Sequence, residues 1–250
     1  MKRNVVLYIF CCYLIFFNVC SKAPQSAREI INRSVEKHGG KALTNWKTMV
    51  VKGEVFQEDV GRKYRGEYIK YAQKPDKLRV ERDLTKFERG RLFYSYIYNN
   101  GKGWMLINLI PYYGKQYGKL FKRWLNQCNG IAYYANSADT LILKPDKKVK
   151  GEKAYVISAI TDNDTTNLYI NKKDYYLIQE EYGKTKRIYS GFKRFGNAIY
   201  PTYIDEITKI GPRTVKVNFI YHSIEYNTPI DQKLFEEDMP NSNISENRKE

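Results

Sequence analysis

Apolar and polar residues alternate along residues 214–221, which predicts a strand with one dry face and one wet face. The dry face is formed by Val215, Val217, Phe219 and Tyr221. Gly211 and Pro212 predict a turn before this strand, so residues 196–226 are expected to form the last hairpin of a long antiparallel sheet. Such a sheet buries its apolar face against a helix or against a ligand.

The same period-two pattern predicts strands along much of the remaining chain. Five strands are expected before residue 110, over residues 49–56, 64–72, 78–84, 92–98 and 104–109. Four more are expected over residues 154–161, 168–170, 175–182 and 187–195. Short turns such as Asn99-Asn100-Gly101 join the strands, because Asn and Gly accept positive φ. No helix separates the first five strands, so they are expected to run antiparallel as a meander.

A helix is predicted to begin at Ser26, which forms a capping-box pattern with Glu29. Gly39 and Gly40 predict its end. His38 lies at that end, where a cation would meet the negative pole of the helix dipole. We therefore interpret His38 as structural rather than catalytic.

A second helix is predicted between residues 111 and 139, where the period changes from two to that of a helix. Its apolar face contains Leu120, Phe121, Trp124 and Leu125, and its basic face contains Lys119, Lys122 and Arg123. This basic amphipathic helix could serve as a lid across the sheet, as a surface for acidic lipid head groups, or as a simple cap on the core.

The composition is compatible with one substantial core. A chain of 250 residues with 42% hydrophobic residues is expected to form a single domain over residues 21–240, followed by a disordered polar tail over residues 241–250. The net charge of +16 makes an acidic partner such as a phospholipid surface reasonable. The charge is spread over every segment, however, which is also typical of a lysine-rich chain with solvated faces.

The N-terminus predicts export. Lys2 and Arg3 precede a nearly uncharged run over residues 4–19, so residues 1–20 are interpreted as a secretory signal that is too short for a membrane span. Cys20 ends this run and is either the acylated first residue of a mature lipoprotein or is discarded with the signal. The expected location faces the periplasm, with an outer-membrane anchor on Cys20. Cys128 is the single cysteine of the remaining chain and is expected to be a small buried hydrophobe.

No sequence motif indicates catalysis. The chain has two histidines and lacks the P-loop, the G-x-S-x-G elbow and any Cys-x-x-Cys pair. Glu180 and Glu181 are neighbours in one strand and point to opposite faces, so they cannot flank one bond. Asp162 and Asp164 are interpreted as turn residues rather than calcium ligands. We therefore expect no enzymatic activity, no metal and no cofactor.

The order of elements resembles the outer-membrane lipoprotein-sorting family of carriers and receptors. The stretches that carry the resemblance are residues 30–55 (IINRSVEKHGGKALTNWKTMVVKGEV), 100–106 (NGKGWML), 168–182 (LYINKKDYYLIQEEY) and 221–235 (YHSIEYNTPIDQKLF). The resemblance implies a mainly β protein whose single, strongly curved antiparallel sheet forms an incomplete barrel, with an N-terminal helix and an internal helical lid. It also implies an apolar cavity that holds acyl chains.

The function expected on this basis is non-catalytic binding of the acyl chains of a lipoprotein or another lipid during transport within the cell envelope. Burial of an acyl chain yields about 0.8 kcal/mol per methylene. By alternation, eight apolar residues are expected to face inward, namely Val51, Val55, Leu78, Val80, Trp104, Leu106, Val217 and Phe219.

Two other functions remain open. One is an envelope scaffold that uses its basic outer surface to bind an anionic glycan or a partner protein. The other is a hydrolase of envelope lipids, which would require a carboxylate and His222 in one cleft. Nucleic-acid binding is not expected of an exported chain with scattered charge. The protein is expected to be a monomer that contacts lipid chains and a membrane surface.

Overall fold

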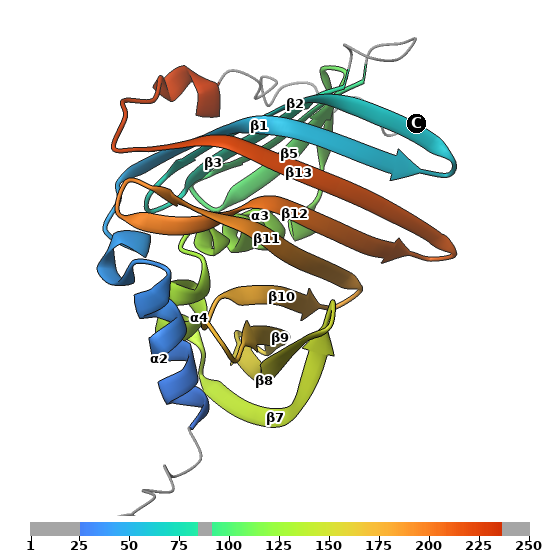
Figure 1. The fold of residues 1–250 in the computed structure, drawn as a ribbon. Coiled ribbons are helices and arrows are strands. Elements are labelled where there is room, and N and C mark those ends of the chain that lie inside the picture. The colour runs from blue at the N-terminus through green and yellow to red at the C-terminus, as the bar shows by residue number, and fades with distance from the viewer. Residues whose placement is uncertain (1–25, 85–91, 237–250) are drawn as a thin grey trace, which may run out of the picture.

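A computed structural model describes residues 26–84 and 92–236, and its main feature is one curved antiparallel sheet (Figure 1). The predicted signal with Cys20, and the predicted tail over residues 241–250, lie outside the described residues. The sheet has 13 strands in the order β6, β5, β4, β3, β2, β1, β13, β12, β11, β10, β9, β8, β7. The strands are β1 (Thr48–Asp59), β2 (Arg62–Gln73), β3 (Lys77–Asp83), β4 (Phe93–Asn99), β5 (Lys102–Ile107), β6 (Ile110–Tyr113), β7 (Thr140–Val149), β8 (Glu152–Thr161), β9 (Asp164–Asn171), β10 (Leu177–Tyr182), β11 (Thr185–Phe195), β12 (Ala198–Ile210) and β13 (Arg213–Tyr226).

The sheet consists of two meanders that join at its centre. One runs from β1 to β6 and the other from β7 to β13, and β1 pairs with β13 along residues 49–58. The two edge strands, β6 and β7, are consecutive in the chain and are connected by α3 (Lys115–Gln127) and α4 (Ile131–Ser137). The helical connection therefore crosses from one edge of the sheet to the other, and Figure 1 shows the sheet curving around it.

Two glycines allow the strong curvature. A Cβ atom on Gly53 would lie 2.0 Å from the Ile220 carbonyl oxygen, and one on Gly66 would lie 1.8 Å from the Asp83 carbonyl oxygen. The register between β1 and β13 also shifts between Lys52 and Gly53. Close backbone approach and a bulge bend the strands, so the sheet coils into an incomplete barrel whose edges stay unpaired with each other.

The N-terminal helix α2 (Ala27–Lys37) begins as the sequence predicts. Ser26 Oγ accepts a hydrogen bond of 3.2 Å from the Glu29 N–H, and Glu29 Oε2 accepts one of 2.8 Å from the Ser26 N–H. Gly39 follows the helix with φ of +116°, and the short helix η1 (Gly40–Leu43) leads into β1. One face of α2 packs against α4, so it covers the end of the sheet formed by β7 to β10. The capping box is confirmed.

The predicted fold class is confirmed, but three elements were missed. The helix α4 is seven residues long and follows Gly130, too short for a helical period to be recognised. The edge strand β6 is four residues long and exposed throughout. The other edge strand, β7, contains Pro145, a register shift and mostly exposed residues, so it lacks an apolar alternation.

The helices divide the interior into two main clusters of buried side chains. In one, α3 packs against the inner face of β3, β4 and β5, and its Phe121 and Leu125 are fully buried in a cluster that also contains residues of β1, β2 and β13. In the other, α2 and α4 pack against β8, β9 and β10. Across the described residues, no helix has both the length and the apolar character required to cross a membrane.

Candidate functional site

A cavity of about 140 Å³ lies where the concave face of the sheet meets the helices. Aliphatic side chains from η1, β1, β12 and β13 line it, including Leu43, Met49, Ile204 and Ile224. The aromatic side chains in its wall are Tyr68, Trp124, Tyr134, Tyr189, Tyr200, Phe219 and Tyr221. A cavity of roughly 150 Å³ holds a benzene molecule. A whole acyl chain is larger, so it would have to extend out of this cavity or displace a helix.

Six of the eight residues predicted to face inward lie on the inner side of the sheet. Val51, Val80 and Phe219 line the cavity itself. Val55, Leu78 and Val217 are buried in the same cluster and pack beneath the helix α3 without lining the cavity. Alternation along these strands thus selects the face that the helices cover. Whether the cavity-lining residues contact a ligand stays a prediction.

Trp104 and Leu106 lie on the other face of the sheet. They form a separate buried cluster with Ile97, which pairs with Trp104 across β4 and β5. Ile97 also pairs with Arg79, whose Nη1 donates a 2.9 Å hydrogen bond to the Leu234 carbonyl. The short helix η2 (Gln232–Phe235) therefore covers this face, and α3 covers the opposite one. Because β4 and β5 are buried on both faces, hydrophobicity alone does not identify the inner face.

The predicted second helix is α3, and its apolar residues lie against the sheet. Phe121 and Leu125 are buried, Trp124 lines the cavity, and Leu120 is partly buried beside them. The basic face of the helix also contacts the sheet, at the strand β9.

Two of the three residues predicted for the basic face of α3 contact β9. Lys119 Nζ lies 3.2 Å from a carboxylate oxygen of Asp164, and Arg123 donates a 2.8 Å hydrogen bond to Thr166 Oγ1. Arg123 also lies over the Tyr182 ring, 4.3 Å from its centroid. These contacts hold α3 across the inner side of the sheet, and they occupy part of the face that could otherwise meet lipid head groups.

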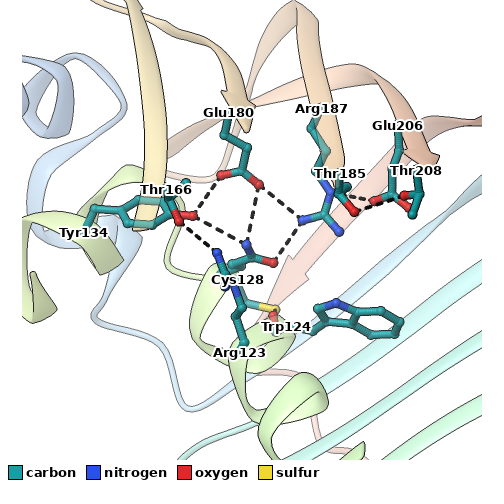
Figure 2. A network of polar contacts seen from close by, with 11 residues as sticks. Arg123, Trp124, Cys128, Tyr134, Thr166, Glu180, Thr185, Arg187, Glu206 and Thr208 are labelled. Carbon is teal, nitrogen blue, oxygen red and sulfur yellow. Dashed lines mark hydrogen bonds and ion pairs between the residues drawn. The ribbon is translucent and has the colours of Figure 1, made fainter. Parts of the chain in front are cut away.

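A network of buried polar side chains joins the helices to the sheet at one side of the cavity (Figure 2). Arg187 of β11 donates from Nε to Glu206 of β12 at 2.6 Å and from Nη1 to Gln127 at the end of α3 at 2.9 Å. The same Nη1 lies 3.3 Å from Glu180 of β10. Tyr134 of α4 donates a 2.9 Å hydrogen bond to the other oxygen of Glu180. One arginine thus links three strands and both helices.

The charges in this network stabilise one another. Burial would raise the pKa of Glu206, but the positive charges of Arg187, Arg82 and Lys70 together outweigh burial, and the pKa is lowered from its ordinary value. Burial raises the pKa of Tyr134, and the Glu180 carboxylate beside it raises that pKa further. Glu206 is therefore ionised at neutral pH and Tyr134 is a neutral donor. The network is a structural clamp rather than an acid–base pair.

Two further cations, Lys70 and Arg82, line the cavity. Lys70 is on β2 and Arg82 is on β3, where Tyr68 pairs with Arg82 and Lys70 pairs with Val80. Directly paired residues share a face, so both cations point to the inner side of the sheet. The sequence contained a weak signal, because Arg82 falls within the apolar series of its strand between Val80 and Leu84. A single charged residue in such a series did not distinguish the cavity from a solvated edge.

His38 is structural, as predicted, but for a different reason. Its Nδ1 lies 2.9 Å from the Ile199 carbonyl oxygen, and its Nε2 accepts a 3.1 Å hydrogen bond from the Leu177 N–H. Nδ1 therefore carries the proton and the ring is neutral. Burial lowers the pKa of His38 below its ordinary value of 6.5. The imidazole connects α2 to β10 and β12 and is not a cation at the helix end.

The arrangement required for a lipid hydrolase does not form in the described cavity. His222 Nε2 lies 3.3 Å from Glu54 Oε1, but this imidazole is 56% exposed, and neither side chain lines the cavity. Cys128 is buried, and burial raises the pKa of its thiol. Glu180 points into the cavity, whereas Glu181 accepts a hydrogen bond from Tyr169 on the outer side, as their opposite orientation predicts. Among the described residues, no three or more His, Cys, Asp or Glu side chains are grouped to hold a metal.

Comparison with known proteins finds similarity in structure and not in sequence. No protein-family model and no curated protein sequence matches the chain. A LolA superfamily protein from Nitrosomonas europaea is similar over 84% of this chain and 98% of its own, with a TM-score of 0.55 and 11% identity. A protein domain described as outer membrane lipoprotein-sorting, from Vibrio parahaemolyticus, is similar over 85% and 98%, with a TM-score of 0.54 and 10% identity. The chain has the fold of lipoprotein-sorting proteins.

A DUF1329 family protein from Desulfovibrio piger has the same fold, with a TM-score of 0.56 and 11% identity over 85% of this chain and 98% of its own. The lipoprotein-sorting fold thus extends over nearly all of the described residues and over nearly the whole of each solved structure. The resemblance inferred from the sequence is confirmed at the level of the fold. At these identities the comparison concerns the fold alone and assigns no ligand.

Proposed function

We propose that the protein binds acyl chains of a lipoprotein or another lipid in the cavity between sheet and helices, without catalysing a reaction, during transport or sorting within the cell envelope. The observation that carries this proposal is the cavity itself, which has a mostly apolar and aromatic wall beneath a helix placed as a lid. Apolar pockets with a few polar groups are typical of ligand sites.

Loading is proposed to require movement of α3 and α4. The present volume of about 140 Å³ accommodates only part of a chain. Each further methylene that enters stabilises the complex by about 0.8 kcal/mol, which can offset the contacts that hold the helices in place. Those contacts are concentrated in the clamp formed by Gln127, Tyr134, Glu180 and Arg187. A carrier needs this balance because it must also release its cargo.

The site of action is proposed to be the periplasmic side of the envelope, with the protein attached to the outer membrane through an acylated Cys20. The sequence pattern of residues 1–20 supports this assignment. Substitution Cys20→Ser should abolish acyl labelling and move the protein from the membrane fraction to the soluble periplasmic fraction. Unchanged membrane fractionation of an unlabelled Cys20→Ser protein would contradict the anchor and leave the cavity proposal intact.

The binding proposal is tested by filling the cavity. Ile204 lines the cavity from β12, and Ile204→Trp should reduce binding of a fluorescent acyl probe by about tenfold or more because the indole occupies the ligand space. Ile207 is three residues along the same strand and does not line the cavity, so Ile207→Trp is the matched control. Equal binding by both variants, or no binding by the wild-type protein, would contradict the proposal.

A second function, a scaffold for an anionic glycan or protein, is supported by one surface feature. Lys147, Lys148 and Lys186 border a pocket of the outer surface that is formed by β7, β9, β10 and β11. Binding through such lysines should weaken steeply as salt is raised, whereas binding in the apolar cavity should not. Titrations at low and high salt with a sulfated glycan and with the acyl probe would separate the two functions. Light scattering of the same samples tests the expected monomeric state.

A further inference from the structure

The cavity contains more positive than negative charge. Its cations are Lys70, Arg82 and Arg187, and Glu180 is the carboxylate in its wall. Glu206 is adjacent through its ion pair with Arg187. Three cations against two carboxylates leave one positive charge in excess. Since buried charges are normally paired, this excess among the described residues favours a site for an anionic group.

Lys70 and Arg82 are the two cavity cations without a direct ion pair to a described carboxylate. Arg187 is bound to both Glu180 and Glu206, whereas neither Lys70 nor Arg82 forms an ion pair with any carboxylate of the described residues. The Nε atom of Arg82 is buried and has no hydrogen-bond acceptor in the part of the chain that the structure describes. A buried donor without an acceptor destabilises the ligand-free protein, and a ligand that supplies the acceptor stabilises the complex.

Aromatic rings are the direct neighbours of these two cations, and the Glu206 carboxylate lies near enough for both cations to lower its pKa. The Arg82 guanidinium carbon lies 5.3 Å from the centroid of the Tyr96 ring and 5.0 Å from that of Phe219. Lys70 Nζ lies 5.9 Å from the centroid of Tyr68 and 5.7 Å from that of Tyr221. The rings orient the cations and shield them from water, but they neutralise no charge. They leave the Arg82 Nε–H without an acceptor among the described residues, and the positive charge of Lys70 lies on the same face of the neighbouring strand.

We propose that Lys70 and Arg82 bind the anionic head group of an amphiphile, a carboxylate or a phosphate, whose hydrocarbon part occupies the apolar portion of the cavity. Arg82 offers a planar set of donors that matches either oxyanion, and Lys70 supplies a second charge from the neighbouring strand. The inference rests on the proposed function and makes it more specific. The acyl chains of a lipoprotein are uncharged esters and amides, so a site of this kind favours free fatty acids or acidic phospholipids over them.

The test compares three ligands with the same hydrocarbon chain, namely laurate, dodecyl phosphate and the uncharged dodecanol. Each competes with a fluorescent acyl probe for the full-length protein. We expect the wild-type protein to bind at least one of the two anions about tenfold or more tightly than dodecanol. The two anionic arms separate a carboxylate site from a phosphate site.

Two variants locate the preference. Lys70→Met and Arg82→Met remove the charges and keep much of the side-chain volume, so they should abolish the preference for anions while dodecanol binding is retained. Both variants should also have a higher Tm than the wild-type protein without ligand, because each removes a partly buried cation that forms no ion pair with a carboxylate of the described residues. Lys52→Met is the matched control, since Lys52 is on β1 with 55% of its side chain exposed and pairs with Glu225 on the outer side.

The possible outcomes are distinct. If all three ligands bind the wild-type protein equally, the head-group proposal is overturned and the acyl-chain proposal stands. If no ligand binds, both proposals are overturned. If the anion preference survives in Lys70→Met and Arg82→Met, other groups of the protein carry it, and the assignment to these two residues is wrong. A lower Tm in both variants would show that the cations already have partners in the empty protein.

Discussion

Removal of Arg187 should be one of the most damaging single changes in this protein. Its guanidinium contacts Glu206 at 2.6 Å, Gln127 at 2.9 Å and Glu180 at 3.3 Å. The side chains of Arg187 and Glu206 are 16% and 13% exposed, so solvent screens their interaction little. Arg187→Met leaves two buried carboxylates without their cation. Breaking a buried pair in this way costs about 3–5 kcal/mol, which is the expected loss in the free energy of unfolding at neutral pH.

The pH dependence gives this prediction a second signature. In the wild-type protein the pKa of Glu206 is lowered, so the ion pair stabilises the fold above the ordinary carboxyl pKa of 4.5 and is lost as the pH falls below it. In Arg187→Met the largest remaining influence on the pKa of Glu206 is burial, which raises it, while Arg82 and Lys70 still lower it. The folded variant then takes up a proton at Glu206 more readily than the folded wild-type protein. The stability difference between wild type and variant should therefore narrow as the pH falls.

Urea unfolding, followed by tyrosine and tryptophan fluorescence at neutral pH and at about pH 5.5, measures both effects. Arg65→Met is the control, because Arg65 forms an ion pair with Glu54 with 47% of the arginine side chain exposed and should cost less than about 1 kcal/mol. Adding Glu180→Gln and Glu206→Gln to Arg187→Met should restore most of the loss. A loss below about 1 kcal/mol in Arg187→Met, or a gap that is constant with pH, would refute the reasoning.

Two further predictions concern stability. His38 is held neutral with its pKa lowered below 6.5, so its contribution to folding is fully present above about pH 6.5 and is lost as the pH falls. His38→Gln should flatten this slope in urea unfolding and His222→Gln should not; identical slopes would contradict the assignment. Gly53→Ala places a methyl group 2.0 Å from the Ile220 carbonyl oxygen and should cost about 3 kcal/mol or more. Gly61→Ala, with no atom within 4 Å and φ of +75°, should cost about 1 kcal/mol. Equal Tm values for Gly53→Ala and Gly61→Ala would contradict the close approach of the β1 and β13 backbones at Gly53.

The strands and their connections follow from local sequence. Alternation with period two, as along Val215, Val217 and Phe219, depends on neighbours within one strand and can be recognised without knowing the partner strand. The turn at Asn100 and Gly101 and the capping box at Ser26 are local in the same sense, and the structure contains both. Short connections between antiparallel strands then leave few topologies, which is why the curved-sheet class could be predicted.

The cavity was decided by tertiary contacts. Trp104 and Met105 are both apolar, and it is the docking of η2 on one side and α3 on the other that determines which of them faces inward. The elements β6, β7 and α4 have no strong pattern of their own, because their order comes from being attached to the sheet or to α2.

The positions of the charged groups in the interior could be predicted from the sequence least of all. Lys70, Arg82, Glu180, Arg187 and Glu206 come from five different strands and look like ordinary surface residues in the sequence. Curvature of the sheet brings them together around one cavity. Arg187 forms ion pairs there with Glu180 and Glu206, whereas Lys70 and Arg82 form no ion pair with a carboxylate of the described residues. The sequence by itself determined the strands, the turns and the apolar faces, since these depend on a few consecutive residues. The electrostatics of the cavity depend on distances between residues of different strands, such as Arg82 and Phe219, and only the folded sheet sets those distances.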